Sequence, residues 1–297
     1  MARDYAFLTL DVFTSQPFGG NPLGVFPKAD GLDTPTMQAI AAELNLSETV
    51  FITSPDDGSP PRLRIFTPKT ELPFAGHPTV GAATVIADRT GRIGKGEFSI
   101  ETTAGQARAE VQRREDGLLE ASVIAPRLPA SGPAPGSDEA AAVLGLNEDQ
   151  IIAPPIAFEA GVPITFVRLA SREALSKARI DTAIWNEVFR NAWAPQVYPF
   201  FMADWQNGRE IHARLFAPGV GIPEDPATGA AAVALAGVLH ELQRPADRTV
   251  SWLIRQGEDM GRPSRIALSA TEEDGRLVSV SIGGPVVPMT RGTLSLS

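Results

Sequence analysis

His77 and Asp225 are the side chains whose sequence context most clearly suggests chemistry, because they take corresponding places in two copies of one motif. The first copy reads RIFTP at 64–68 and GHPTVGAA at 76–83, and the second reads RLFAP at 214–218 and EDPATGAA at 224–231. Seven positions are identical, while the histidine of one copy is replaced by aspartate in the other. Both side chains can take up and release a proton, so this pair is suited to general acid–base catalysis.

The spacing of the two copies indicates a duplicated domain. Arg64 and Arg214 are 150 residues apart, and His77 and Asp225 are 148 apart, in a chain of 297 residues. Solenoid repeats are much shorter, at roughly 20–50 residues. Chance could also match Ala, Gly and Pro, which are abundant here, but the conserved order and spacing favour duplication. We therefore expect two halves with the same architecture.

Each copy also predicts the start of a buried helix. Proline at the first helical position needs no partner for an N–H group, and His77 or Asp225 before it would be the cap. Backbone N–H groups at the positive end of a helix bind anions. We therefore expect the two helix starts to face each other across a domain cleft and to hold a carboxylate through Gly76, Gly229 and Ala230. Taken singly, Asp225 could be only an N-cap and His77 only a turn residue.

Glu48 is a third candidate acid or base. It lies between a helix that opens at 33–35 and the β-branched and aromatic run 49–52, and hence at a helix-to-strand junction. Asn21 ends the irregular loop PFGGN at 17–21 and is expected to line the same cleft. Alone, such a glutamate is most often a solvated surface acid, and such a loop can be only a tight turn.

Strands and helices alternate in both halves of the predicted fold. Each half has several short strands and one helix of small apolar residues, from 78 to about 89 and from 226 to about 239. A hairpin is predicted at 98–113, and a two-residue turn at Asp274-Gly275. Four prolines in 126–136 predict a linker. The expected domains are 1–125 and 138–283, joined by a linker at 126–137, with the tail at about 284–297 a candidate to return to the first half.

Composition excludes several kinds of partner and site. The net charge is −9, whereas nucleic acids and acidic membranes bind basic faces, so we expect neither as a partner. The chain has no cysteine, which rules out disulfides and thiol nucleophiles, and its three histidines have no metal-ligand spacing. No signal segment or membrane-spanning run is apparent, so a cytoplasmic location is expected.

Five blocks of sequence resemble the PhzF-like phenazine-biosynthesis isomerase family. They are DVF at 11–13 through GNP at 20–22, SETVF at 47–51, FTP at 66–68 through GHPT at 76–79, EDPATG at 224–229, and QG at 256–257 through MGRPS at 260–264. That family is similar in fold to diaminopimelate epimerase and proline racemase. The resemblance implies an α+β protein of two pseudo-symmetric halves, each a β-sheet or barrel wrapped around a central helix.

The resemblance also implies a mechanism. Glu48 would remove a proton from a ring carbon of a dihydro-hydroxyanthranilate and return it elsewhere, assisted by His77 and Asp225, without a cofactor or metal. The related epimerases carry cysteines at the two helix starts, and this chain has none, which favours a one-base proton shuttle. The family often has serine where this chain has Ala230, so a hydroxyl is lost there while the backbone N–H remains. Family members are commonly homodimers, so a homodimer is expected.

The leading hypothesis is a cofactor-independent isomerase that moves a proton on a small carboxylic acid. Two alternatives stay open. One is an epimerase or racemase of a small amino or hydroxy acid, and the other is a protein that binds small acids without turning them over. The complete set of Glu48, His77 and Asp225 favours an enzyme.

Overall fold

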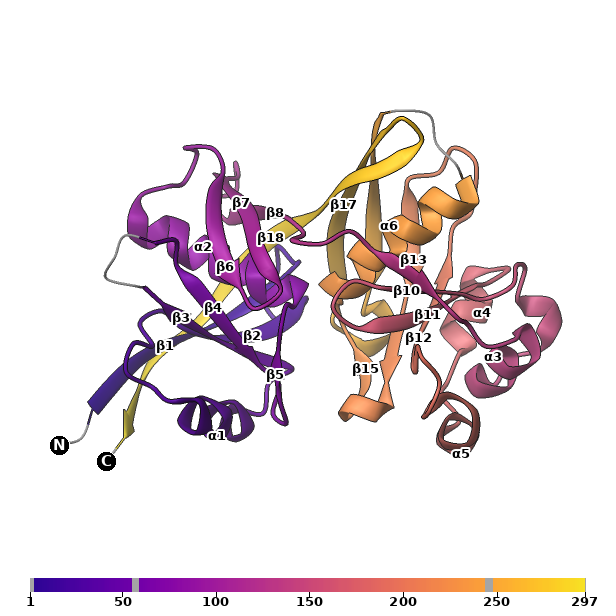
Figure 1. Cartoon of the computed structure of the whole chain (residues 1–297), viewed down its shortest axis with the longest axis horizontal. Coiled ribbons are helices and arrows are strands. Elements are labelled where there is room, and N and C mark those ends of the chain that lie inside the picture. Colours follow the sequence, from indigo (N-terminus) through magenta and orange to yellow (C-terminus); the bar gives the residue numbers. More distant parts are fainter. Residues whose placement is uncertain (1–2, 55–58, 244–247, 297) are drawn as a thin grey trace. The chain divides into compact units, whose positions relative to one another are not determined.

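The computed structural model describes residues 3–54, 59–243 and 248–296. The chain forms two compact units, one of Met1–Arg127 with Ile282–Ser297 and the other of Leu128–Ser281 (Figure 1). The last strand, β18 (Arg276–Leu296), begins in the second unit and ends in the first. Both units combine strands with a long buried helix, which confirms the predicted α+β class of two epimerase-like halves.

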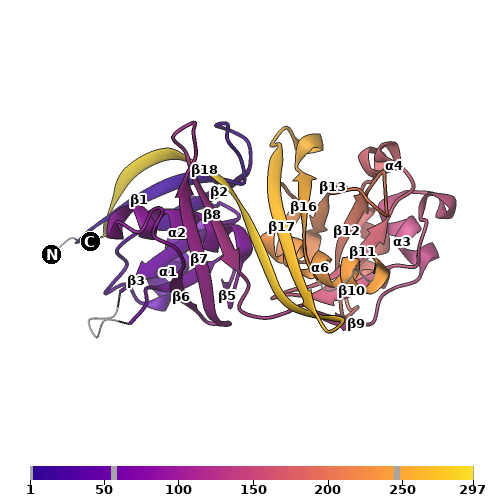
Figure 2. The ribbon, with the colours of Figure 1, turned by 90° about the horizontal axis from the view of Figure 1, so that it is seen from above.

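In the described part of the first unit, eight strands form a closed ring. Their order around the ring is β1 (Arg3–Val12), β2 (Asn21–Phe26), β3 (Glu48–Thr53), β4 (Arg62–Phe66), β6 (Phe98–Thr102), β7 (Gly105–Arg113), β8 (Leu119–Ile124) and β18. Helix α2 (Gly76–Thr90) packs against strands around this ring and is buried from residue 76 to residue 87 (Figure 2). The strands therefore form a barrel whose core is one helix.

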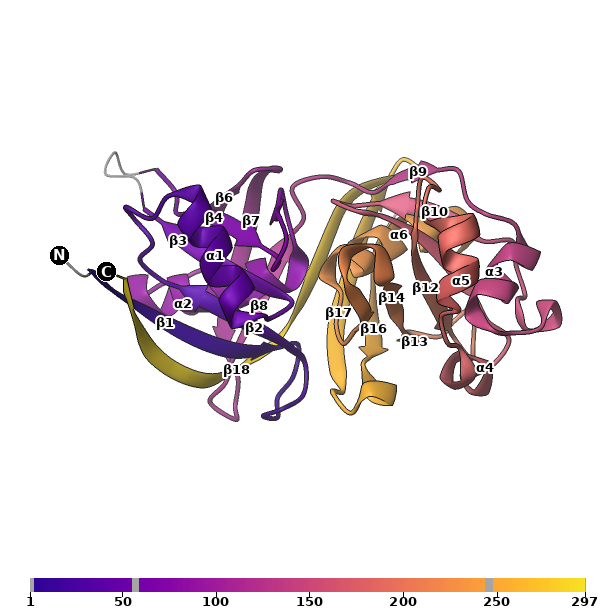
Figure 3. The ribbon, with the colours of Figure 1, turned by 90° about the horizontal axis from the view of Figure 1, so that it is seen from below.

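Helix α1 (Thr34–Leu44) covers the outer face of this barrel (Figure 3). Asp33 caps it, because its carboxylate accepts from the Thr36 N–H at 2.9 Å, and Asn45 ends it in the left-handed conformation. Its apolar face packs on a row of aromatic side chains, one from each of four neighbouring strands. These residues are Tyr5, Phe26, Phe51 and Phe66, against Met37, Ile40 and Ala41 of the helix. This layer anchors the segment that leads into Glu48.

The second unit repeats the plan. Its strands are β9 (Ala130–Gly132), β10 (Ile156–Glu159), β11 (Pro163–Arg168), β12 (Gln196–Phe201), β13 (Glu210–Ala213), β14 (Leu215–Ala217), β15 (Ile222–Asp225), β16 (Thr249–Gln256), β17 (Ser264–Glu273) and the start of β18. Helix α6 (Gly229–Gln243) packs on β9, β10, β11 and β17. On another side, α3 (Ser137–Leu144), α4 (Arg172–Lys177) and α5 (Thr182–Ile184) bury Trp185 and Phe189 with β11 and β12. Residues 130–132, within the predicted linker, pair as β9 with β10.

The duplicated motif forms the same substructure in both units. In the first unit, β4 pairs antiparallel with β5 (Glu71–Leu72) before α2, and in the second, β14 pairs antiparallel with β15 before α6. Both central helices are 15 residues long. Arg64 binds both carboxylate oxygens of Glu71, and Arg214 binds both of Glu224 at 2.8 Å each. The repeat in sequence is therefore also a repeat of contacts.

Our prediction of the two helix starts is wrong in detail. Helix α2 begins at Gly76, so His77 is its second residue and Ala75 is the cap. Helix α6 begins only at Gly229, so Asp225 lies four residues before it. The reason is that Asp225 still pairs with Leu215 in the β14–β15 ladder, which keeps the chain extended to that point.

Candidate active site

Three polar residues of the first unit meet where three elements begin. Asn21 is the first residue of β2, Glu48 is the first residue of β3, and His77 lies in the first turn of α2. Strands β2 and β3 are parallel, with Leu23 opposite Glu48, so their first residues lie at one edge of the barrel. The sequence prediction that Asn21, Glu48 and His77 belong to one site therefore fits the geometry of this unit.

His77 lies between the other two side chains. Its Nδ1 is 3.3 Å from Nδ2 of Asn21, and its Nε2 is 3.3 Å from Oε2 of Glu48. Asn21 is fully buried and His77 is 3% exposed, whereas 12% of the Glu48 side chain is exposed. Glu48 is thus the member of the cluster that solvent or a small molecule can reach.

The contacts fix the protonation of the imidazole. An amide NH₂ group can only donate, so Asn21 Nδ2 donates to His77 Nδ1, which must carry no proton. The remaining proton of the neutral ring is then on Nε2, the nitrogen that lies 3.3 Å from Oε2 of Glu48 without forming a hydrogen bond to it. Burial lowers the pKa of His77 to about 3, and the nearby carboxylate does not offset that effect. His77 is therefore neutral at physiological pH, and its Nε2 faces the Glu48 carboxylate at 3.3 Å.

This arrangement suits proton transfer at Glu48. A neutral imidazole beside one carboxylate oxygen brings no positive charge to the group, and the partly exposed carboxylate can act as a general base. His77 cannot itself serve as a ready proton source near neutral pH, since its pKa is far below 7. The cluster supports one acid–base group with two neighbours that set its orientation.

Asp225 lies in a second cluster, in the second unit. It is 6% exposed, and its Oδ2 accepts a hydrogen bond from the Thr228 hydroxyl at 2.5 Å. A hydroxyl donor this close holds the Asp225 carboxyl group in one orientation. The short segment between β15 and α6 thus presents a fixed carboxyl group.

Gln256 ties this segment together, and our sequence analysis missed its role. Its side-chain Nε2 donates to the Asp225 carbonyl at 2.8 Å and to Thr228 Oγ1 at 3.0 Å. Its Oε1 accepts from the Thr228 N–H at 3.3 Å and from the Tyr198 hydroxyl at 3.2 Å. Burial, followed by the charge of Asp225, raises the pKa of Tyr198, so this hydroxyl stays protonated and donates. Gln256 is fully buried, so these four bonds make it a structural clamp.

A close backbone contact requires glycine at position 257, directly after Gln256. The φ of Gly257 is +74°, and a Cβ there would lie 2.3 Å from the Arg262 carbonyl oxygen and 2.7 Å from that of Pro226. The backbone at Gly257 therefore approaches the Asp225–Thr228 segment more closely than any other residue permits. The only sequence signal for this contact is the QG pair at 256–257 in the family-like block.

The remaining predicted binding residues lie at the helix starts. Gly76 is the buried first residue of α2, and Gly229 and Ala230 are the buried first residues of α6. Each helix start thus carries backbone N–H groups of the kind that bind carboxylates. That these groups bind a substrate, and that both clusters serve one substrate, stays a prediction.

The described residues contain neither a metal-ligand cluster nor a membrane-spanning helix. Among them, no group of three or more His, Asp or Glu side chains is placed to hold a metal ion. None of their helices combines the length and the apolar character needed to cross a membrane.

Comparison with known proteins shows the family. The family model for phenazine biosynthesis-like proteins, PhzC-PhzF, matches residues 10–292, and the chain belongs to this family. An uncharacterized isomerase of Mesorhizobium japonicum is 41% identical over 97% of this chain and 98% of its own. The trans-2,3-dihydro-3-hydroxyanthranilate isomerase of Pseudomonas fluorescens is 34% identical over 98% of this chain and 99% of its own. The crystal structure of a PhzF-family phenazine biosynthesis protein from Bacillus anthracis matches with a TM-score of 0.84. The two chains are 25% identical, and the match covers 98% of this chain and 99% of the other. The resemblance seen in the sequence blocks is therefore confirmed.

Proposed function

We propose that the chain is a cofactor-independent isomerase that moves a proton between two carbon atoms of a small carboxylic acid. Its full-length relatives carry isomerase names, which supports this class of enzyme. The Pseudomonas relative is named for a cyclic, amino-substituted carboxylic acid, and we infer a substrate of that chemical class. The observation that carries the proposal is Oε2 of a partly exposed Glu48 at 3.3 Å from Nε2 of a buried, neutral His77.

In the proposed reaction Glu48 acts first as base and then as acid. Its carboxylate takes a proton from a substrate carbon, and the electron pair of the broken C–H bond delocalises into the conjugated acid. The protonated Glu48 then returns the proton to a different carbon, so a double bond moves and no electron is gained or lost overall. His77 holds one Glu48 oxygen, and Asn21 holds His77.

The substrate carboxylate has a separate proposed site. The N–H groups of Gly76, Gly229 and Ala230 would bind it, because helix starts favour negative charge. Asp225, fixed by Thr228, would bind a donor group of the substrate and orient the ring. Ala230 offers only its backbone N–H, so this enzyme would bind the carboxylate with one hydroxyl fewer than relatives with serine there.

The test uses solvent deuterium and one matched pair of variants. Trans-2,3-dihydro-3-hydroxyanthranilate is incubated with the protein in D₂O, and deuterium in the product is read by NMR. We expect deuterium at the newly protonated carbon. Glu48→Gln keeps the size of the side chain but removes the base, and turnover should fall by at least about a hundredfold. Glu43→Gln, on the exposed face of α1, is the matched control and should keep full turnover.

Two results would contradict the proposal. Near-normal turnover in Glu48→Gln would remove Glu48 from its role. Activity that EDTA abolishes and added metal restores would replace the acid–base mechanism by a metal-dependent one. If the dihydroanthranilate is inert, the same exchange assay across small carboxylic acids finds the substrate, and no exchange with any of them would favour a protein that only binds acids.

The product distinguishes an isomerase from an epimerase. Movement of a double bond changes which carbons are sp² and which carry the transferred hydrogen, whereas epimerisation changes only the configuration at one carbon. Both outcomes incorporate deuterium, so the NMR spectrum of the product decides between them.

We also propose a cytoplasmic homodimer, as the family resemblance implies. Sedimentation equilibrium of the purified chain would show a mass near twice 31.5 kDa. A single species at the monomer mass would contradict the dimer.

A further inference from the structure

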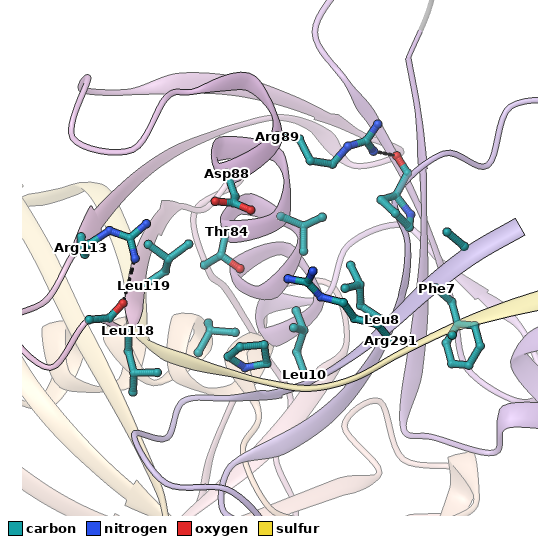
Figure 4. A pocket seen from close by; sticks show the side chains of 17 residues that line it. Phe7, Leu8, Leu10, Thr84, Asp88, Arg89, Arg113, Leu118, Leu119 and Arg291 are labelled. Atoms are coloured by element: carbon teal, nitrogen blue, oxygen red, sulfur yellow. Dashed lines mark hydrogen bonds between the residues drawn. The ribbon is translucent and has the colours of Figure 1, made fainter.

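The first unit has a second cavity, away from Glu48 and His77. It has a volume of about 480 Å³, which is within the range of roughly 300–1,000 Å³ usual for small-molecule sites. It lies over the C-terminal half of α2, between β18 and the start of β8 (Figure 4). Its helix residues run from Thr84 to Arg89, so they lie roughly 10–18 Å along the helix axis from His77 at 1.5 Å per residue. The cavity is therefore separate from the candidate active site.

The floor of this cavity is apolar. Side chains of three strands and of the helix line it, among them Phe7, Leu8, Leu10, Val85, Leu119 and Val286. Val85 and Leu10 are nearly buried, at 8% and 4% exposed. An apolar ligand group that covers this surface is bound favourably, because each buried CH₂ contributes about 0.8 kcal/mol to the binding free energy.

The rim of the cavity is positively charged. Arg89, Arg113 and Arg291 line it, with Asp88 as the one acidic residue in the lining, which leaves a net charge of +2 at the cavity. This excess stands out in a chain whose net charge is −9. In Figure 4, Arg89 and Arg113 lie on opposite sides of the cavity and Arg291 lies between them. The positive charges are therefore spread around the cavity.

The three arginines keep donors for a ligand. Arg113 donates to the Gly117 carbonyl at 2.9 Å and Arg89 donates to the Pro27 carbonyl, which uses one of the five N–H donors of each. The Arg291 guanidinium has no hydrogen bond or ion pair with any residue that the structure describes. This guanidinium is thus the one most available to a carboxylate.

A β-bulge directs Arg291 into the cavity. In the β1–β18 ladder Thr9 pairs with Thr290 but Leu10 pairs with Pro288, so Met289 is an extra residue in β18. Side chains of a regular strand alternate between two faces, so Pro288 and Arg291 would point to opposite faces without the bulge. The bulge reverses the alternation, and both residues line the same cavity. The charge at the mouth therefore depends on a specific feature of the backbone.

From these features we propose that the cavity binds a small amphipathic anion, with its carboxylate or sulfonate at Arg291 and its apolar body on the floor around Val85. Inorganic phosphate would leave the apolar floor exposed to water, and a neutral lipid would leave the arginines without a partner. The proposal is independent of the reaction proposed for Glu48.

The test measures binding of octanoate to the full-length protein by isothermal titration calorimetry. Octanoate supplies both features, 1-octanol lacks the charge, and hexanoate has two fewer CH₂ groups. We expect octanoate to bind at least tenfold more tightly than either. Arg291→Glu reverses the charge on an exposed side chain and should weaken octanoate binding at least tenfold. Arg276→Glu, at the exposed start of β18, is the matched control and should change binding less than twofold.

A second variant tests the floor and a third separates the two sites. Val85→Phe fills the cavity and should abolish octanoate binding, while circular dichroism reports whether the variant is folded. Glu48→Gln should leave this binding unchanged, whatever its effect on turnover. Equal octanoate affinity in Arg291→Glu and the wild type would overturn the proposal, as would equal affinity for 1-octanol. If Arg291→Glu instead splits a dimer in sedimentation and octanoate does not bind the wild type, the cavity is a subunit contact and the proposal is wrong.

Discussion

His77 should remain uncharged in the folded protein down to about pH 4, although a carboxylate lies 3.3 Å from its Nε2. In an exposed site such a carboxylate would favour the imidazolium, because opposite charges stabilise each other. Here burial dominates and lowers the pKa to about 3, from 6.5 for an unperturbed histidine. The consequence is a penalty on folding at acidic pH that can be measured.

The sign and size of the penalty follow from proton linkage. Between pH 6.5 and pH 3 the unfolded chain binds a proton at His77 and the folded chain does not, so stability falls as the pH falls. The slope approaches about 1.4 kcal/mol per pH unit in that window. From pH 7 to pH 5 the loss of unfolding free energy assignable to His77 is therefore about 2 kcal/mol.

Urea unfolding of the wild type and of His77→Gln at pH 7 and pH 5 isolates this contribution. Glutamine can still donate toward Glu48 but does not titrate, so the wild type should lose about 2 kcal/mol more than the variant on acidification. Repeating the comparison in a Glu48→Gln background removes the neighbouring carboxylate from both chains. Nitrogen-15 NMR of the imidazole should show the proton on Nε2 throughout pH 5–8.

A wild type that gains stability relative to His77→Gln as the pH falls would contradict a neutral His77. That outcome would mean a charged imidazolium paired with Glu48. Glu48 would then face a positive charge that depresses its own proton affinity, and the proposed return of the proton to the substrate would need another acid.

Two further predictions compare matched positions. Arg214→Met should cost about 3–5 kcal/mol of unfolding free energy, because the Arg214 side chain is only 4% exposed and its loss leaves the Glu224 carboxylate with no cation. Arg64→Met should cost about 1 kcal/mol, because the Arg64 side chain is 21% exposed. Equal losses of unfolding free energy in urea titrations would contradict the role of burial. Gly257→Ala should have a clearly lower melting temperature than Gly261→Ala. Both glycines have a positive φ, but only at Gly257 would a Cβ lie 2.3 Å from a carbonyl oxygen. Similar melting temperatures of the two variants would show that the backbone at Gly257 relaxes at little cost.

Local features of the fold were predictable from the sequence, because they depend on residues close together in the chain. Asp33 and Asn45 bound α1 as capping chemistry requires. The turn at Asp274-Gly275 has positive φ at both residues, at 51° and 69°, as a tight hairpin needs. The hairpin of β6 and β7 also forms where the sequence predicts it.

Long-range closure was not predictable in the same way. The first barrel is completed when β1 pairs with β18 from Arg3 to Val12, across almost the whole chain. The tail at about 284–297 was a candidate to return to the first half, but no local pattern encodes that it pairs with β1 or in which register. The bulge at Met289, which turns Arg291 toward the cavity, arises within this same pairing and could not be predicted from the sequence either.

The candidate site was predicted in part, for a physical reason. Glu48, His77 and Asn21 lie in sequence blocks that resemble those of the family, and these blocks mark them although each residue type alone also fits an ordinary structural role. Gln256 acts through three hydrogen bonds to Asp225 and Thr228 and a fourth to Tyr198, and its residue type gives no hint of these contacts. Residues that hold a reactive group are harder to find in a sequence than the reactive group itself.

The duplicated motif shows why equivalent positions in the two halves do not have equivalent chemistry. His77 is presented from inside the first turn of α2, where its ring meets Glu48 from a neighbouring strand. Asp225 still belongs to a strand, and its carboxylate is fixed by a hydroxyl three residues later, before α6 begins. The helix start thus falls one residue before His77 but four residues after Asp225. Duplication preserved the arginine–glutamate pair and the buried helix, while the backbone between them changed and allowed a neutral donor in one half and a fixed carboxylate in the other.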